Sequence, residues 1–203
     1  MKLAISNIAW KPDERFKVYD LLRKKGIKNL EIAPGLLFFS SEDPLMPSNK
    51  LVKEIKLELK NAELNIVSMQ SLFYGSKLSV LFGTPSERVH FENNFKKAIN
   101  LAEKLEIPNL VFGSPKNRCF PKNLNKIDAF FSVKDLFLRL GDYAKSSGTI
   151  IGIETNPTAY GTNFLTNLND TIKFIEQINH KNVKITLDTG ELFFSDYSSQ
   201  LNE

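Results

Sequence analysis

Alternation of short apolar runs with longer amphipathic runs is the feature of this sequence that most restricts its fold. The short runs are typical of strands, at residues 3–7, 30–33, 64–69, 109–112, 149–154 and 183–187. The longer runs have helical spacing, at residues 13–25, 48–62, 86–105, 127–146 and 169–179. Strands separated by helices of this length predict βαβ crossovers, and therefore an α/β fold with a parallel sheet.

Two α/β architectures fit six such units. An open doubly wound sheet is complete with six strands, whereas a (β/α)8 barrel contains eight and needs about 250 residues. The chain has 203 residues and no low-complexity linker or internal repeat. We therefore expect one domain over residues 1–203, which in the barrel alternative is incomplete at the C-terminus.

Composition excludes several other classes of protein. The single cysteine, Cys119, excludes a disulfide framework and a cysteine-based zinc cluster. There is no apolar stretch of membrane-spanning length and no signal peptide, so we expect a cytoplasmic protein without membrane contact. The net charge of +4 comes with lysines scattered over the predicted helices, which favours solvated faces over a nucleic-acid footprint.

Polar side chains follow every predicted strand. In both architectures the carboxyl ends of the strands build the functional site. The residues in question are Ser6 and Asn7, Glu31, Gln70, the run Lys116, Asn117 and Arg118, Glu154 with Asn156, and Asp188. Six occurrences of this kind favour a site over coincidence.

Glu154 and Asp188 each end a strongly apolar strand, where an unpaired carboxylate is costly. Their positions on successive strands favour a divalent cation bound by both. Oxygen ligands alone suit Mg²⁺ or Mn²⁺, and an added histidine would allow Co²⁺ or Zn²⁺ as well. Each could instead cap a helix or bind a lysine. His90 lies within a predicted helix and His180 at a helix end, which indicates structural or surface roles.

The other strand-end residues have two interpretations each. Lys116, Asn117 and Arg118 could recognise an anion or a hydroxyl group, or form an exposed loop. Trp10 could wall a sugar pocket or cover the mouth of a barrel. Neither a G-x-G-x-x-G nor a P-loop motif is present, so dinucleotide and P-loop nucleotide binding lose their main support.

Five stretches resemble one known family, at residues 2–10, 31–34, 110–118, 154–164 and 187–190. The strings GSPKNR (residues 113–118) and ETNP (residues 154–157) followed by YGTNF (residues 160–164) are the most specific of them. On these residues the chain resembles the xylose isomerase-like TIM-barrel superfamily, within its sugar phosphate isomerase/epimerase group. The resemblance covers essentially the whole chain and implies a (β/α)8 TIM barrel of which about six βα units are present.

The resemblance also implies a chemistry. It is that of a divalent-metal-dependent isomerase or epimerase, which moves a proton at carbon in a sugar, sugar phosphate or polyol through an enediolate. Glu154 would be a metal ligand and the general base, and Asp188 a metal ligand for Mn, Mg, Co or Zn. Substrate-binding candidates are Trp10, Gln70, Lys116, Asn117, Arg118 and Asn156. The expected partner is a small carbohydrate, and a homo-oligomer is left open.

The sequence departs from the family pattern in two respects. Many relatives have a histidine three residues after the strand-six aspartate, where this chain has Glu191. Strands seven and eight, with a histidine ligand and a second catalytic carboxylate, are also missing, so we expect an incompletely liganded metal and no normal turnover. Whether the chain is an enzyme therefore stays open. The alternatives are an endonuclease-IV-like DNA repair barrel, which needs a histidine-rich zinc cluster, and a non-catalytic sugar-binding or partner-binding fragment.

Overall fold

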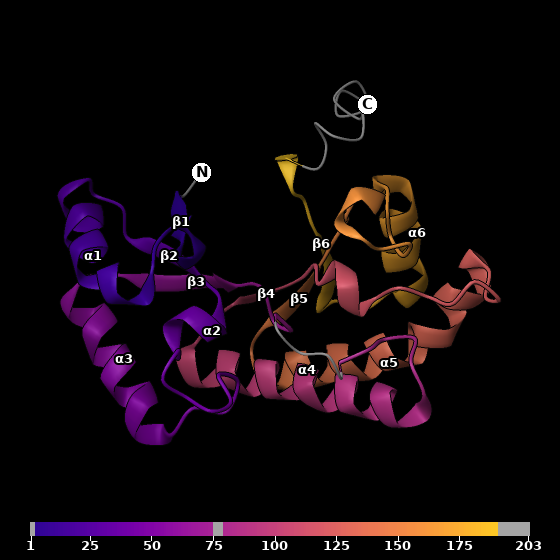
Figure 1. Cartoon of the computed structure of the whole chain (residues 1–203), viewed down its shortest axis with the longest axis horizontal. Coiled ribbons are helices and arrows are strands. Elements are labelled where there is room, and N and C mark those ends of the chain that lie inside the picture. The colour runs from indigo at the N-terminus through magenta and orange to yellow at the C-terminus, as the bar shows by residue number, and fades with distance from the viewer. Residues whose placement is uncertain (1–2, 75–78, 191–203) are drawn as a thin grey trace.

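The computed structural model describes residues 3–74 and 79–190, and its centre is a single parallel sheet (Figure 1). The described strands are β1 (Ala4–Ser6), β2 (Asn29–Ile32), β3 (Asn65–Met69), β4 (Asn109–Phe112), β5 (Ile150–Glu154) and β6 (Val183–Thr186). They are hydrogen-bonded in the order β1-β2-β3-β4-β5-β6. A doubly wound sheet reverses its order at a switch point, whereas a barrel follows the order of the chain. The barrel prediction is therefore confirmed, and the doubly wound alternative is wrong.

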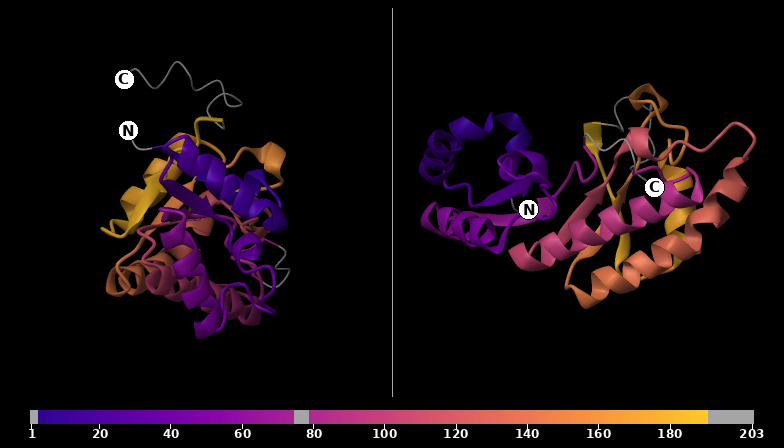
Figure 2. Two further views of the ribbon diagram at one scale, coloured as in Figure 1. Left: turned by 90° about the vertical axis from the view of Figure 1, so that its left-hand side faces the viewer. Right: turned by 60° about the horizontal axis from the view of Figure 1, so that its bottom comes forward.

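The helices surround the sheet on its outer side (Figures 1 and 2). They are α1 (Arg15–Lys24), α2 (Pro34–Leu37), α3 (Asn49–Asn61), α4 (Pro85–Leu105), α5 (Lys126–Ser146) and α6 (Leu168–Ile178). Short 3₁₀ turns lie at Asn7–Ala9, Pro12–Glu14, Pro115–Asn117 and Thr158–Tyr160. The four-residue α2 and the 3₁₀ turns were not predicted, because one turn is too short to show an apolar period.

Local signals place the helix ends close to their predicted positions. The Ser48 hydroxyl accepts a hydrogen bond from the Leu51 backbone N–H (3.2 Å) and caps α3. Gly26 follows α1 with φ +70°, the left-handed conformation that ends many helices. The buried face of α3 is formed by Val52, Ile55 and Leu59, while Leu51 is only partly buried.

A cluster of phenylalanines fills the core between the sheet and the helices α4 and α5. Phe112 on β4 packs against Phe73, Phe91, Phe95 and Phe137, with ring centroids 5.4–6.0 Å apart. These side chains are almost completely buried. The core thus holds β4 and its neighbouring strands against α4 and α5, and so orients the carboxyl ends of these strands.

Pairing along the sheet is uneven. β4 and β5 pair through four residues each, as do β5 and β6, while β3 and β4 pair only at Met69 and Leu110. The described sheet therefore consists of two well-paired halves, β1–β3 and β4–β6, and each half supplies its own group of strand-end side chains.

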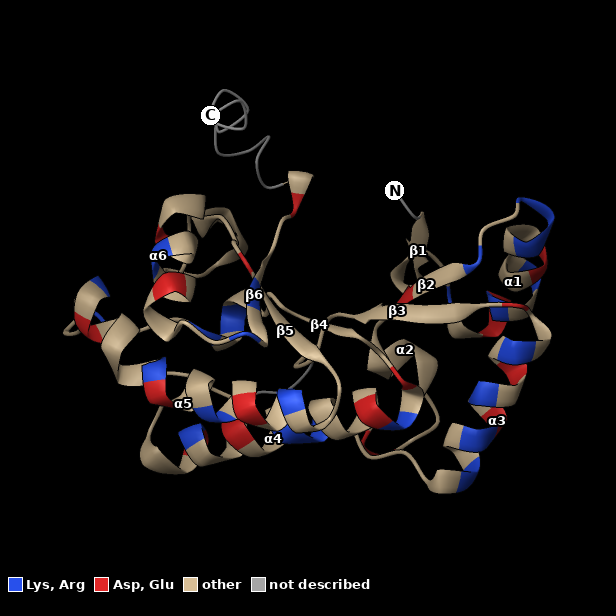
Figure 3. Ribbon diagram, turned by 180° about the vertical axis from the view of Figure 1, so that it is seen from behind, with Lys and Arg blue, Asp and Glu red and all other residues tan. Residues whose placement is uncertain are grey.

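Charged side chains of both signs are interspersed along α3, α4 and α5 (Figure 3). This distribution agrees with the prediction of solvated helix faces. In the described ranges, no helix is long and apolar enough to cross a membrane.

Candidate functional site

Glu154 is the last residue of β5, on the strand face opposite to the buried side chains of Ile151 and Ile153. Its carboxylate lies against the backbone of Gly113, directly after β4, where an added Cβ would overlap Oε2 of Glu154. Nδ2 of Asn156 donates a hydrogen bond to Oε2 of Glu154 (3.0 Å). The predicted pair Glu154 and Asn156 is thus brought together, and Gly113 makes the space for it.

The electrostatic environment of Glu154 is acidic. Burial is the largest cause that raises the pKa of this carboxyl above its ordinary value, and the charges of Asp188 and Glu31 raise it further. The hydrogen bond from Asn156 and the charge of Arg118 oppose the rise in pKa. Glu154 therefore interacts electrostatically with both Glu31 on β2 and Asp188 after β6.

Asp188 lies two residues beyond β6 and is exposed, and its Oδ1 accepts a hydrogen bond from the Gly190 backbone N–H (2.8 Å). Across residues 3–74 and 79–190, no three His, Cys, Asp or Glu side chains are grouped so that they could hold a metal ion. Two carboxylates have the oxygen chemistry that Mg²⁺ and Mn²⁺ prefer. The donor set fits such a cation in kind but is only part of a coordination sphere. Glu191 lies outside the described residues.

A second polar group joins the ends of the first three strands. Nε2 of Gln70, after β3, donates to Oγ of Ser6 on β1 (2.8 Å) and to Oε1 of Glu31 on β2. Asn7 fastens the neighbouring loop, because its Oδ1 accepts from the Ala33 backbone N–H (2.7 Å). Gln70 was a predicted substrate-binding residue. Ser6 and Glu31 were not among the predicted site residues, although their positions at strand ends could have indicated them.

The run Lys116, Asn117 and Arg118 separates in the structure. Lys116 is exposed, while Nδ2 of Asn117 donates to the Ser79 carbonyl (2.8 Å) and holds a neighbouring loop. Arg118 is fully buried, and its Nη1 donates to the backbone carbonyl of Glu154 (2.7 Å). Its guanidinium also lies 5.8 Å from the centroid of the Phe112 ring. Arg118 therefore supports the end of β5 from inside the protein.

Trp10, His90 and His180 belong to parts of the chain other than β5, the strand that carries Glu154. Trp10 is half-buried and packs on the core beside a small cavity lined by Asn7 and Leu37. His90 is exposed on α4. Nδ1 of His180 accepts from the Asn182 backbone N–H (3.1 Å), and Nε2 lies 3.2 Å from Oδ1 of Asp142. His180 thus has the structural surroundings that were predicted.

A cavity of about 1210 Å³ opens beside the first three strand ends. Its lining includes Ile8, Ala33 and Ser71, which follow β1, β2 and β3, together with His90 and Lys97 on α4. Neither Glu154 nor Asp188 lines it. Ser6, Glu31 and Gln70 do not line it either, so the cavity is separate from both groups of strand-end side chains.

Comparison with known proteins agrees with this architecture. The model of the family described as xylose isomerase-like TIM barrel matches residues 19–203. The chain belongs to this family. No curated protein sequence matches the chain significantly.

Solved structures similar to this member of the family include sugar epimerases. D-psicose 3-epimerase from Clostridium cellulolyticum H10, solved with D-tagatose, has a TM-score of 0.74 and 16% identity over 95% of this chain and 65% of its own. L-ribulose 3-epimerase has a TM-score of 0.69 and 15% identity over 99% of this chain and 65% of its own. The IOLI protein with a bound zinc atom has a TM-score of 0.67 and 18% identity, over 94% and 64%. The chain thus spans about two thirds of the length of these structures, and the likeness establishes the fold.

Proposed function

We propose that this chain contributes the β1–β6 part of a divalent-metal-dependent isomerase or epimerase that acts on a sugar, sugar phosphate or polyol. The observation that carries the proposal is the position of Glu154, a half-buried carboxylate at a strand end, with Asp188 and Glu31 within electrostatic reach. The sugar epimerases among the similar structures support the substrate class.

In the proposed reaction Glu154 removes a proton from the carbon next to the substrate carbonyl. Its half-buried position at a strand end suits this role, because a general base must be held within reach of the proton that it removes. Asn156 orients the carboxylate through its hydrogen bond to Oε2, and Gly113 keeps that position open. Arg118 holds the Glu154 backbone carbonyl and so fixes the end of β5.

Glu154 and Asp188 would hold the divalent metal, with water or substrate oxygens as further ligands. A bound metal polarises the carbonyl and stabilises the negative charge of the enediolate. Gln70, whose Nε2 donates to Ser6 and Glu31, would bind substrate hydroxyl groups at the other half of the sheet. The role of Lys116 in anion recognition stays a prediction, as do those of Asn117 and Trp10.

Metal binding provides the test, because it does not depend on turnover. Calorimetric titration of the chain with Mn²⁺ is expected to give a saturable signal that Glu154→Gln and Asp188→Asn each abolish. Glu176→Gln, an exposed carboxylate on α6, is the matched control and should bind as the unaltered chain does. A signal that survives Glu154→Gln would refute this assignment of the site.

A proton-exchange assay addresses the chemistry separately. In deuterated buffer, a ketose incubated with the chain and Mn²⁺ should gain deuterium at the carbon next to the carbonyl. Loss of this exchange in Glu154→Gln would show that proton removal requires Glu154, as metal ligand or as base. Exchange that is equal in the two proteins would show that another group removes the proton.

A further inference from the structure

The cavity of about 1210 Å³ beside α4 has room for a small organic ligand, since ligand pockets usually measure about 300–1,000 Å³. We call it the α4 cavity. It is lined by Ile8 after β1, residues 33–36 and 41–46 after β2, residues 71–74 after β3, and three side chains of α4. The residues of the proposed catalytic site do not line it, so a ligand in this cavity would bind in addition to the substrate.

One wall of the α4 cavity is polar. His90, Asn94 and Lys97 are four and three residues apart on α4, so they lie on one face of this helix. Nζ of Lys97 donates to Oδ2 of Asp43 (2.9 Å), and Nδ2 of Asn94 donates to Oγ of Ser79 (2.8 Å). These contacts hold Lys97 and Asn94 in place before any ligand binds.

The ends of β2 and β3 supply an apolar wall and an aromatic rim. Ala33, Leu72 and Phe73 line the cavity and are almost completely buried. The Tyr74 side chain also lines it, yet is 94% exposed. A turn holds Tyr74 at this position, because its backbone N–H donates to the Ser71 carbonyl (3.1 Å). Ser71 has φ +56°, a left-handed conformation that is costly for a residue other than glycine and is often found at ligand sites.

The charges of the α4 cavity disfavour an anionic ligand. Among its described lining residues, Lys97 is the only lysine or arginine, and Asp43 neutralises it. Glu42 adds a negative charge and is exposed. A phosphate or carboxylate group would therefore meet no unpaired lysine or arginine in this cavity.

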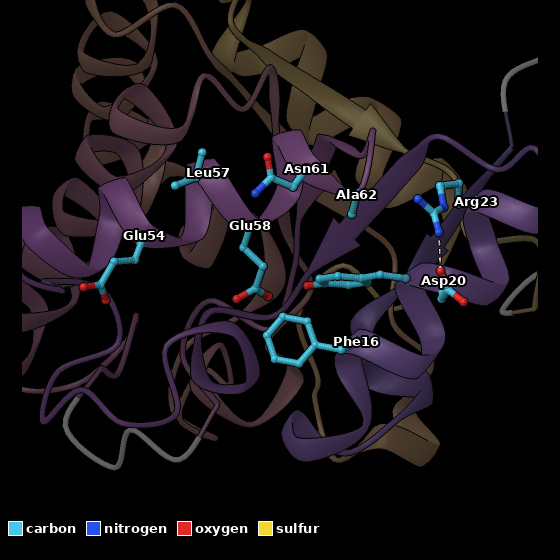
Figure 4. A pocket seen from close by; sticks show the side chains of 9 residues that line it. Phe16, Asp20, Arg23, Glu54, Leu57, Glu58, Asn61 and Ala62 are labelled. Carbon is cyan, nitrogen blue, oxygen red and sulfur yellow. Dashed lines mark hydrogen bonds and ion pairs between the residues drawn. The ribbon is translucent and has the colours of Figure 1, made fainter.

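The groove between α1 and α3 has a different lining (Figure 4). Two of its acidic side chains are bound by arginines, Asp20 by Arg23 (2.5 Å) and Glu58 by Arg15 (2.8 Å). Uncharged groups that donate and accept hydrogen bonds are more numerous in the α4 cavity. They are the hydroxyl groups of Ser41 and Ser71, the amide of Asn94 and the imidazole of His90. A wholly apolar ligand would leave such groups without partners, which is costly.

An uncharged sugar combines the properties that this lining requires. One face of a pyranose ring carries C–H groups, which pack on an aromatic ring, while its hydroxyl groups both donate and accept hydrogen bonds. We propose that the α4 cavity binds an uncharged sugar at a site separate from the one at Glu154. The sugar ring packs on Tyr74 and the apolar wall, and its hydroxyl groups bind Asn94 and His90.

NMR titration with sugars that lack a free carbonyl tests the proposal, because the reaction proposed at Glu154 cannot act on them. The probes are the methyl α-glycosides of glucose, mannose and galactose, and sucrose. At least one of them should bind saturably, with a dissociation constant of about 1 mM or less. It should shift the backbone signals of residues that line the α4 cavity. Failure of all four to bind, or shifts confined to other residues, would overturn the proposal.

Two variants test the assigned contacts. Tyr74→Ala should raise the dissociation constant of the bound sugar about 3- to 10-fold, and Asn94→Leu should raise it about 2- to 10-fold. The matched controls are Tyr160→Ala and Asn93→Leu, since both side chains are exposed and neither lines the cavity. The controls should leave the dissociation constant unchanged, and circular dichroism should show all four variants folded. If Tyr74→Ala bound the sugar as tightly as Tyr160→Ala does, the proposed packing would be refuted.

Glucose 6-phosphate and cyclohexanol test the class of ligand. Measured from the signals of the cavity residues, both should bind less tightly than the sugar, because one adds negative charge and the other lacks most hydroxyl groups. Tighter binding of either compound would overturn the assignment of an uncharged sugar. Glu154→Gln should leave the affinity for the sugar unchanged, so this result is independent of the proposed reaction.

Discussion

Replacement of Gly113 by alanine tests the geometry on which the proposed function depends. The glycine follows β4 and has no positive φ, so an alanine backbone is not strained there. Its methyl group would nevertheless overlap Oε2 of Glu154 and approach Oδ1 of Asn156 to 3.4 Å. Gly113→Ala therefore displaces the Glu154 carboxylate without changing any group that could bind metal or substrate.

The size of the effect follows from two contributions. Forcing a methyl group into a filled space costs about 1–3 kcal/mol of folding free energy. Rotation of the carboxylate away from the methyl breaks the hydrogen bond from Asn156 (3.0 Å), and bonds to charged groups contribute about 1.5–3 kcal/mol. Because Oε2 is the far end of a flexible side chain and can move aside, the overlap itself costs little, and we expect a total loss of about 1.5 kcal/mol, mainly from the hydrogen bond. Misplacing a ligand should weaken Mn²⁺ binding about 10- to 100-fold.

Urea unfolding followed by circular dichroism measures the loss of stability, and calorimetry measures Mn²⁺ affinity. Gly35→Ala is the matched control, since an added Cβ on Gly35 of α2 meets no atom within 4 Å. It should change stability by no more than about 0.5 kcal/mol. If Gly113→Ala kept both the stability and the Mn²⁺ affinity of the unaltered chain, the packing of Glu154 against Gly113 would be refuted. Lost stability with unchanged affinity would show that Glu154 is not a ligand.

Two further predictions concern stability. The hydrogen bond from Arg139, together with that from Lys96, lowers the pKa of Glu92 to about 2. A carboxyl group whose pKa is lowered by folding stabilises the folded state above pH about 4.5, and this stabilisation is lost as the pH falls towards about 2. The full shift would correspond to about 3 kcal/mol, which solvent screening of this partly exposed group reduces to about 1 kcal/mol. Glu92→Gln should therefore be about 1 kcal/mol less stable than the unaltered chain at pH 7. The difference between their urea midpoints should shrink below pH about 4.5. A difference that does not change with pH would contradict the assigned cause. Phe112→Ala should lower the free energy of unfolding in urea by about 3–5 kcal/mol, because the ring is fully buried among four others. Phe131→Ala is the control, since the Phe131 side chain is 58% exposed. Equal losses in the two variants would refute the description of the core.

The secondary structure could be predicted from sequence because its signals are local. The strand predicted at residues 109–112 matches β4, and the helix predicted at 127–146 differs from α5 by one residue. The first predicted helix, at 13–25, is in fact a 3₁₀ turn at Pro12–Glu14 followed by α1. A 3₁₀ turn and the first turn of an α-helix have similar residue preferences, so the pattern could not separate them.

The choice between the two architectures needed information that local patterns do not contain. Both folds alternate strands with helices, and they differ in which strands are neighbours. Strand order depends on contacts between residues far apart in the chain, such as Ile151 with Val183 on the adjacent strand β6. The family resemblance favoured the barrel, and the chain-order pairing of the sheet confirmed it.

The sequence by itself determined that polar groups would gather at the carboxyl ends of parallel strands. It did so because apolar runs that end in Glu154 or near Asp188 are visible without any structure. Only the tertiary structure decided which of these groups meet. Gln70 lies 64 residues from Ser6 and 39 from Glu31, yet it donates hydrogen bonds to both.

The run from Lys116 to Arg118 shows the same division most clearly. Its composition indicated three side chains with one role, in recognition or in an exposed loop. The 3₁₀ turn at Pro115–Asn117 directs successive side chains apart, so Lys116 is exposed while Arg118 lies buried behind β5. The type of each residue is a property of the sequence, but its burial is set by the strands and rings that fold against it.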